Sequence, residues 1–219
     1  MDIISAILLA YLLGAIPFAF ILGKVLKGID LRKVGSGNIG ATNLVRAAGF
    51  KIGVFGLILD VLKGVIPVIV IADLIKTNYG LSRDSLRLIL GIASISGHNW
   101  TIFLNFKGGK GIATTLGVLI GLAIKNIIIL KITFMLALIW GVSFISIGYV
   151  SLASIISAFF LPIFLYIFKL NKDFIIFGIV MTIFAILRHK PNIYRLLQHK
   201  EQHFNIKSKF PFLKKKALP

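Results

Sequence analysis

The sequence predicts an all-α protein that crosses a membrane several times, and three properties of the chain indicate this class. Hydrophobic residues make up 58% of the 219 residues and charged residues only 15%, whereas a soluble domain is usually about 45–50% apolar and about 25% charged. The mean hydropathy is +0.96. Several apolar runs reach the roughly 20 residues that a membrane-spanning helix needs. Intrinsic disorder is excluded because it requires low hydrophobicity.

The apolar runs predict seven membrane spans. The run of residues 132–168 is long enough for two helices, with a tight turn near Ser146-Ile147-Gly148. Five spans is the alternative if the short runs, 112–124 and 174–187, are re-entrant or interfacial. In chain order the runs are residues 3–23, 52–72, 88–106, 112–124, 132–168 and 174–187.

The distribution of positive charge predicts the orientation of these spans. Asp2 precedes the first apolar run and the first cation, Lys24, follows it, so the run lacks the basic start of a signal peptide. The positive-inside rule then places the N-terminus outside and the C-terminus in the cytoplasm. The predicted cytoplasmic regions are 24–51, 97–111 and 188–219, with the motif of the last one in 188–203; they hold 17 of the 25 Lys and Arg residues.

The net charge of +18 would by itself suggest a nucleic-acid partner. A nucleic-acid binder carries its cations on a wet surface, and most of this chain has none, so no such partner is expected. The basic tail from Lys207 to Pro219 is predicted to be solvated near anionic lipid headgroups. Cysteine is absent, which excludes disulfides and Cys-ligated metal. We expect one domain that comprises residues 1–219.

The first cytoplasmic region contains a glycine-rich segment, Gly35-Ser36-Gly37-Asn38-Ile39-Gly40-Ala41-Thr42-Asn43, followed by Arg46. It matches G-x-G-x-x-G formally, but a dinucleotide site requires a strand, a turn and a helix, and membrane spans flank this segment. Glycines still allow backbone N–H groups to converge on an anion. Ser36, Asn38, Thr42 and Asn43 add hydroxyl and amide groups, and the planar guanidinium of Arg46 suits phosphate. An ordinary polar turn is the alternative.

The second region reads Gly97-His98-Asn99-Trp100, then Phe106-Lys107-Gly108-Gly109-Lys110-Gly111 before an apolar run. It is not a P-loop, because Gly111 follows Lys110 where Ser or Thr is required. Free N–H groups and the positive end of the following helix nevertheless favour an anion-binding site. The alternative is a surface turn with snorkelling lysines. His98 taken alone favours a structural role.

The third region reads Arg188-His189-Lys190-Pro191-Asn192-Ile193-Tyr194-Arg195, with Glu201 downstream. His189 and Asn192 are three residues apart, so a helix presents both on one face. Pro191 predicts that the last span ends near His189 and that a short helix restarts at Pro191. A basic flank that stops membrane insertion is the alternative.

Asp60 and Lys63 lie inside the second predicted span. Charged residues in a membrane are costly and are functional candidates by default. Three residues apart, the two side chains can pair on one helix face. A structural ion pair inside the helix bundle is an equally favoured interpretation.

These three segments, in this order, resemble the acyl-phosphate:glycerol-3-phosphate acyltransferases, the PlsY family. The resemblance covers nearly the whole chain; Pro191 stands where that family usually has a polar or charged residue. It implies a seven-helix membrane bundle in the bacterial inner membrane with its active site facing the cytoplasm. The implied reaction converts acyl phosphate and sn-glycerol 3-phosphate to lysophosphatidic acid and phosphate, the first acylation of bacterial phospholipid synthesis.

The resemblance also implies that no metal or nucleotide cofactor is needed, because acyl phosphate is already activated, and that the protein is coupled to an enzyme that makes acyl phosphate. The sequence also lacks the His-x-x-x-x-Asp motif that other glycerolipid acyltransferases use. Phe103 follows His98 at that spacing and Tyr194 follows His189.

The candidate site residues come from all three regions. Arg46 and Lys110 are predicted to hold phosphate groups, and Gly108, Gly109 and Gly111 to form the site for glycerol 3-phosphate. By resemblance Ser36, His189 and Asn192 complete the reaction centre. His189 is either the base that takes the glycerol hydroxyl proton or only an orienting group, with acyl phosphate taking the proton. The further substrate-binding candidates are Asn38, Thr42, Asn43, His98, Lys107 and Glu201.

A small membrane transporter for phosphorylated solutes is the alternative function. It would explain cytoplasmic anion-binding sites and intramembrane charges. Transporters usually place their site near the bilayer midplane, often between repeated halves. Here the polar motifs lie at one predicted face and no internal repeat is evident.

Overall fold

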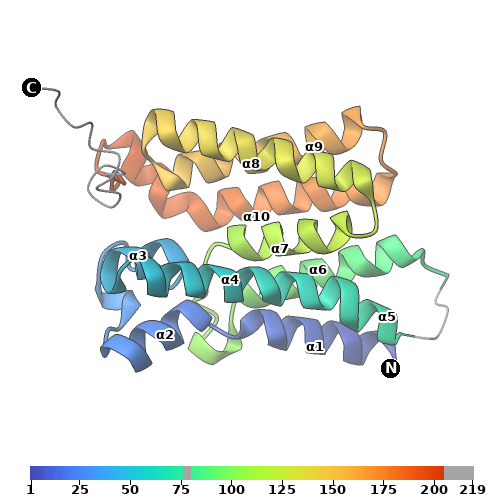
Figure 1. The fold of residues 1–219 in the computed structure, drawn as a ribbon, viewed down its shortest axis with the longest axis horizontal. Helices are drawn as coiled ribbons and strands as arrows, with labels where there is room; N and C mark the ends of the chain where they lie inside the picture. Colours follow the sequence, from blue (N-terminus) through green and yellow to red (C-terminus); the bar gives the residue numbers. More distant parts are fainter. Residues whose placement is uncertain (76–79, 205–219) are drawn as a thin grey trace, which may run out of the picture.

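The computed structural model describes residues 1–75 and 80–204, and every regular element in these residues is helical (Figure 1). The predicted all-α class is thereby confirmed. The prediction for the tail from Lys207 lies outside the described residues. In chain order the elements are α1 (Ile3–Ala15), α2 (Phe18–Lys27), η1 (Leu31–Lys33), α3 (Ala41–Ala48), α4 (Phe50–Ile66), η2 (Pro67–Ile71), α5 (Ala72–Leu74), α6 (Arg83–Asn99), η3 (Ile102–Leu104), α7 (Ile112–Ala123), α8 (Ile127–Ile147), α9 (Val150–Ile167) and α10 (Lys172–Leu197).

Five helical segments in the described residues are long and apolar enough to cross a membrane. Two of these segments contain more than one element: the first comprises α1 and α2, and the second comprises α4, η2 and α5. The shorter α7 is also apolar, and α6 has only 17 residues. The five segments are Ile3–Lys27, Phe50–Leu74, Ile127–Ile147, Val150–Ile167 and Lys172–Leu197.

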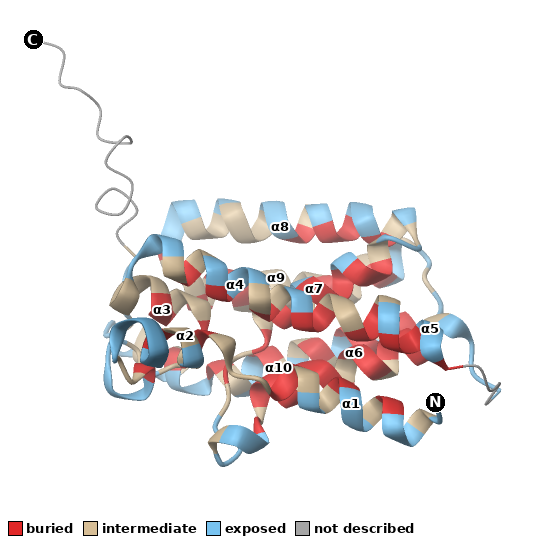
Figure 2. Ribbon diagram, turned by 60° about the horizontal axis from the view of Figure 1, so that its bottom comes forward, coloured by how far each residue is buried: buried red, intermediate tan, exposed pale blue. Residues whose placement is uncertain are grey.

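The helices lie roughly along one axis, with α7 between a group containing α1, α4 and α6 and a group containing α8, α9 and α10 (Figure 1). Buried residues face the interior and exposed ones the outer faces (Figure 2). Many exposed side chains are large and apolar, among them Ile4 at 69% exposed and Ile145 at 73%. Apolar surface of this extent indicates a membrane contact.

Small residues bring the helices close together. A Cβ atom on Gly14 of α1 would overlap the backbone of Ser94 in α6, and one on Gly64 of α4 would overlap the backbone of Thr114 in α7. Such contacts are typical of helix packing in membranes. They hold α6 and α7, and therefore the loop between them, in place against α1 and α4.

The Asp60–Lys63 pair is present and buried, with 3.0 Å between Lys63 Nζ and Asp60 Oδ1. Lys63 also donates to the carbonyl oxygen of Ile16 at 2.8 Å. That carbonyl lies at the break between α1 and α2, next to Pro17. The same carbonyl accepts from the N–H of Phe18 at 3.1 Å, so Lys63 adds a second donor there and connects α4 to the break.

Two sequence-based expectations about helix ends have different outcomes. The long apolar run divides as predicted, because α8 ends at Ile147 and Gly148 adopts φ +77°. The predicted break at Pro191 is wrong, since α10 continues through it. Proline removes the N–H that would bond to the Leu187 carbonyl. Both Leu187 and Pro191 are exposed, so that carbonyl can be solvated from outside while the buried face of α10 stays packed.

Candidate active site

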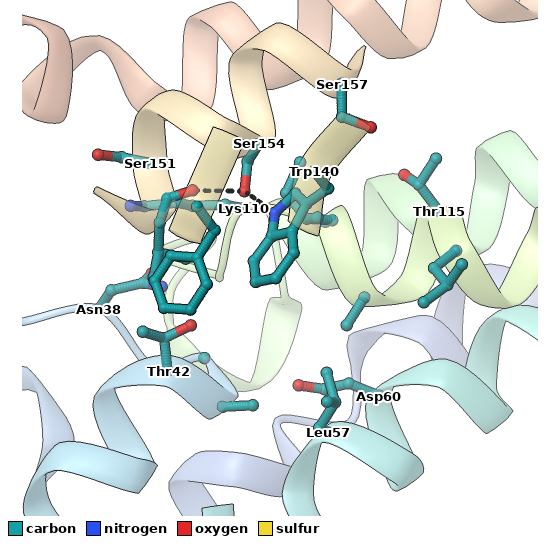
Figure 3. Close-up of a pocket in the computed structure, with 18 of the residues that line it drawn as sticks. Asn38, Thr42, Leu57, Asp60, Lys110, Thr115, Trp140, Ser151, Ser154 and Ser157 are labelled. Atoms are coloured by element: carbon teal, nitrogen blue, oxygen red, sulfur yellow. Dashed lines mark hydrogen bonds between the residues drawn. The ribbon is translucent and has the colours of Figure 1, made fainter. Parts of the chain in front are cut away.

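A cavity of about 490 Å³ brings the three predicted regions together at one end of the bundle. Eleven of the fourteen candidate residues line it. They are Ser36, Asn38, Thr42, Asn43 and Arg46 from the first region, His98, Lys110 and Gly111 from the second, and His189, Asn192 and Glu201 from the third. Figure 3 shows Asn38, Thr42 and Lys110 around this polar end.

The shape of the first region depends on Asn43, which is 1% exposed. Its Nδ2 group contacts the carbonyl oxygens of Leu31, Val34 and Asn38 at 2.9–3.0 Å. Its Oδ1 atom accepts from the N–H of Ser36 at 3.0 Å. The amide of Asn43 is therefore fully used inside the loop, where it positions Ser36 at the cavity.

The left-handed backbone at Gly35 and Gly37, with φ +57° and +71°, lets the loop turn around Asn43. A Cβ atom at Gly35 would overlap the Asn43 Oδ1 atom. These two positions therefore require glycine for a steric reason. The formal G-x-G-x-x-G spacing serves a tight loop, not a dinucleotide fold.

Arg46 lies in the last turn of α3 and faces the cavity. Its Nη1 donates to Gln202 Oε1 at 3.1 Å and its Nη2 to the Gln202 carbonyl at 3.3 Å. The ring of Phe204 lies 5.8 Å from the guanidinium carbon. Burial lowers the pKa of Arg46, but an arginine keeps its charge in proteins. Among the described residues both hydrogen-bond acceptors of Arg46 are neutral, so Arg46 presents a preformed cationic group.

The second region forms a turn that leads into α7. The N–H of Gly109 donates to the His98 carbonyl at 2.9 Å, and Gly111 at φ +78° begins the helix without a side-chain cap. The first N–H groups of a helix lack intrahelical partners and carry its positive end. An anion is favoured at this position.

Lys110 extends into the cavity from this turn. Burial lowers the pKa of its amino group to about 8; Glu201 opposes the shift, and Arg195, Arg46 and Arg188 add to it. Several cations therefore converge on one small volume. Such an arrangement is unfavourable without an anion and favours binding one.

The third region places His189 and Asn192 on the buried face of α10, as predicted, each 2% exposed. The Nδ1 atom of His189 lies 2.8 Å from the carbonyl oxygen of Ala185. A carbonyl can only accept, so Nδ1 carries a proton and the neutral ring keeps its lone pair on Nε2. That atom can take a proton.

Glu201 binds three side chains instead of presenting a free carboxylate. Its Oε1 accepts from Asn192 Nδ2 at 2.6 Å and from Ser151 Oγ at 2.9 Å, and its Oε2 accepts from Arg195 Nε at 2.8 Å. Burial opposes the charge of the carboxylate, but the hydrogen bonds from Asn192, Arg195 and Ser151 outweigh it and lower the pKa of Glu201. Glu201 therefore links α9 and α10 at the cavity.

The other end of the cavity is apolar and lies among α4, α7, α8 and α9. Two of its hydroxyl groups donate to backbone carbonyls, Thr133 to Ile129 at 2.7 Å and Ser157 to Leu136 at 3.0 Å. The hydroxyl of Thr115 donates to Met181 Sδ at 3.9 Å. Figure 3 shows Ser154 held between a carbonyl and the Trp140 indole, which donates to it at 3.1 Å. The apolar lining includes Leu57, Leu116, Leu119, Leu136, Ala137 and Leu161.

Three of the predicted residues are not part of the cavity lining. Lys107 is exposed on the turn. Gly108 and Gly109 lie close to His98, because a Cβ atom on Gly108 would overlap the His98 carbonyl and one on Gly109 would overlap its imidazole ring. The two glycines can shape the turn, whereas Lys107 has no described role in the cavity.

Sequence reasoning missed Ser151, Gln202 and Phe204, which contact or line the site, and the contacts that Arg188 makes. Ser151 belongs to an apolar run without a motif, Gln202 lies at the end of the third region, and Phe204 follows that region. Of these residues only Arg188 could have been identified from the sequence, because it is a cation directly before His189 in the third region. Among the described residues, no cluster of three or more His, Cys, Asp or Glu side chains is placed to hold a metal.

Comparison with known proteins agrees with this arrangement. The chain matches the family model for Glycerol-3-phosphate acyltransferase over residues 4–199. The glycerol-3-phosphate acyltransferase of Fusobacterium nucleatum is 44% identical over 200 residues, which cover 90% of this chain and 96% of the relative. That of Aquifex aeolicus is 39% identical over 204 residues, with coverages of 93% and 100%.

Two crystal structures of PlsY (YgiH), an integral membrane glycerol 3-phosphate acyltransferase, have the same fold. The glycerol 3-phosphate form matches with a TM-score of 0.83 and 38% identity, covering 94% of this chain and 97% of that one. The lysophosphatidic acid form matches with a TM-score of 0.81 and 36% identity, covering 96% and 98%. The resemblance of the three motifs is confirmed, and the chain belongs to the glycerol-3-phosphate acyltransferase family of integral membrane enzymes.

Proposed function

We propose that this acyltransferase moves an acyl chain from acyl phosphate to sn-glycerol 3-phosphate, which yields lysophosphatidic acid and phosphate. The observation that carries the proposal is one cavity with a cationic, glycine-rich end and an apolar end between helices. An acyl phosphate has the same two parts. The long tail would lie along the apolar lining while both phosphate groups occupy the cationic end.

The cationic end is suited to bringing two anions together. Arg46, Lys110 and the uncapped start of α7 lie around it. Preorganised charges and N–H groups offset the repulsion between the substrates and stabilise the charge that develops on the departing phosphate. Ser36 and Asn192 lie at the same end and complete the proposed reaction centre.

The proposed step forms one bond and breaks one. The glycerol hydroxyl oxygen attacks the acyl carbonyl carbon, and the bond from that carbon to the phosphate oxygen breaks. The hydroxyl proton passes to His189 Nε2, whose lone pair is free because Nδ1 bonds Ala185. Inorganic phosphate leaves with the electron pair of the broken bond.

The same proposal includes the topology. We infer seven spans, with α6 and α7 as the two short ones, in a single domain of residues 1–219. The N-terminus lies outside, and the cavity and the C-terminus face the cytoplasm of the bacterial inner membrane. The clustering of 17 of 25 cations in the predicted cytoplasmic regions 24–51, 97–111 and 188–219 supports this orientation. Acyl phosphate would come from a separate enzyme that produces it.

A phosphate-release assay tests the reaction directly. The purified protein in detergent is expected to release phosphate from acyl phosphate only when glycerol 3-phosphate is also present. Equal activity with acyl-CoA and none with acyl phosphate would reject the proposed donor. Flux of glycerol 3-phosphate into proteoliposomes without acyl transfer would instead support the transporter alternative.

Gly109→Ala is expected to raise the KM for glycerol 3-phosphate by about tenfold or more, equivalent to about 1.4 kcal/mol of binding. A Cβ atom at this position would overlap the imidazole of His98 and displace the turn before α7. Steady-state kinetics against glycerol 3-phosphate measure the effect. Gly141→Ala is the matched control, because a Cβ at that helical glycine meets no atom within 4 Å. An unchanged KM in the Gly109 variant would indicate a plain surface turn.

The pKa of about 8 at Lys110 predicts a loss of substrate affinity at alkaline pH. Below that pH the amino group is charged and attracts phosphate; above it the charge is lost, so kcat/KM should fall by up to about tenfold per pH unit. Arg stays protonated throughout this range, so Lys110→Arg should remove the fall. Profiles of kcat/KM for both proteins, corrected for spontaneous hydrolysis, measure this. A wild-type profile that stays flat well above pH 8 would contradict the prediction.

A further inference from the structure

Arg188 binds the turn from Gly108 to Lys110 on the side away from the cavity. It precedes His189 on α10 and does not line the cavity. Its Nε donates to the Gly109 carbonyl at 2.9 Å and its Nη2 to the Gly108 carbonyl at 2.8 Å. The planar guanidinium thus spans two consecutive carbonyl groups, which a point charge such as an ammonium does less well.

These two bonds orient the peptide groups that lead into Lys110, which lines the cavity. In a trans peptide the N–H points opposite to the C=O. The peptide after Gly108 is held on both sides, by Arg188 at its carbonyl and by the His98 carbonyl at its N–H. The peptide after Gly109 is held at its carbonyl only. Its N–H, that of Lys110, points away from Arg188 and has no hydrogen-bond partner among residues 1–75 and 80–204.

The guanidinium is itself oriented by an aromatic side chain. The ring of Trp100 lies 5.7 Å from its central carbon, within the range of a cation–π contact. Phe184, one helical turn before Arg188, meets the same ring edge-on at 5.0 Å. The carbonyl of Trp100 accepts from the Tyr11 hydroxyl at 2.6 Å. Trp100 is therefore fixed from both α1 and α10.

We propose that Arg188 is a positioning residue for the acceptor substrate. It sets the turn from Gly108 to Lys110 so that the free N–H of Lys110 faces the phosphate of glycerol 3-phosphate. Because Arg188 and His189 are neighbours on one helix, the same element positions the phosphate site and the proton acceptor relative to each other. This inference rests on the acyl transfer proposed above.

Arg188→Gln tests the proposal, because it replaces the guanidinium that spans two carbonyls with a shorter, neutral amide. We expect the KM for glycerol 3-phosphate to rise by about tenfold or more while kcat and the KM for acyl phosphate change by less than about threefold, since uniform binding is lost. Arg188→Lys, which retains one charge, should lie between this variant and the wild type. Lys190→Gln is the control, as it removes an exposed cation two residues along α10 and should behave as wild type.

A double-mutant cycle separates positioning from a general structural role. Arg188→Gln and Gly109→Ala should disturb the same turn, so their combined effect on the KM should be smaller than the product of the single effects. Full additivity, or equal losses in kcat and in both KM values, would overturn the inference. If Arg188→Gln fails to fold, by size-exclusion chromatography and thermal unfolding, the cycle is measured with Arg188→Lys.

The wild-type protein measured in parallel distinguishes the two proposals. A wild type that transfers acyl groups, together with an unchanged KM in Arg188→Gln, overturns the positioning role alone. A wild type that transfers no acyl group from acyl phosphate overturns the proposed function, and the inference about Arg188 with it.

Discussion

His189→Ala is expected to lower kcat by about 10²–10⁴-fold, the usual contribution of a general base. His189 lines the cavity, is 2% exposed and has its Nδ1 engaged by the Ala185 carbonyl at 2.8 Å, so its orientation is fixed and Nε2 is the ring atom left to accept a proton. Alanine supplies neither the base nor an orienting group. Initial rates of phosphate release at saturating concentrations of both substrates measure the loss.

The size of this loss decides between the two roles left open for His189. A fall of less than about tenfold would assign the proton to acyl phosphate, because general base catalysis contributes more than that. His199→Ala serves as control, since His199 is exposed beyond α10 and should retain wild-type rates. Unfolding temperatures must match for both variants, so that a folding defect is not mistaken for a catalytic one.

Asn43→Ala is expected to lower activity by about 10²-fold, which is the cost of a misplacement of about 1 Å at a reaction centre. One buried amide serves three carbonyl groups and the N–H of Ser36. Among residues 1–75 and 80–204 no other side chain donates to those carbonyls, and only the Val34 carbonyl has a further donor there, the N–H of Gly37 at 3.0 Å. Without the amide we therefore expect Ser36 to lose its position at the cavity. Activity and thermal unfolding of the purified variant measure both consequences.

Asn126→Ala separates catalysis from stability in this prediction. Asn126 caps α8 through the N–H of Ile128 at 2.9 Å, and loss of a cap costs about 1 kcal/mol. The control should therefore unfold at a lower temperature but keep its specific activity. Wild-type activity in Asn43→Ala would show that the loop keeps its shape without the amide. It would contradict the prediction that Asn43 positions Ser36.

Most of the helix positions follow from local sequence. The charge-free run of residues 132–168 is too long for one span, and glycine is the residue that most readily adopts a left-handed turn, so the division at Gly148 was predictable. Spacing also placed His189 and Asn192 on one face. The error at Pro191 arose because a local rule, the missing N–H of proline, competes with the packing of a whole helix, which no local pattern reports.

The candidate site was predictable as a set of residues and not as a set of roles. Cationic segments that contain glycine or histidine identified Arg46, Lys110 and the residues near His189. That Asn43 is used inside its loop, and that Glu201 binds Ser151, Asn192 and Arg195, depends on partners elsewhere in the chain. Arg46 and Gln202 are 156 positions apart, so no motif contains both.

The sequence by itself determined the membrane class, the positions of most helices and the chemistry of the three cationic segments, because composition, apolar runs and residue spacing are local properties. Only the tertiary structure decided that these segments share one cavity, that Lys63 serves the broken α1–α2 connection, and that Arg188 orients the turn before α7. Each of these depends on hydrogen bonds between groups far apart in the chain, which exist only when close helix packing has removed water and left each buried donor and acceptor to find its partner within the protein.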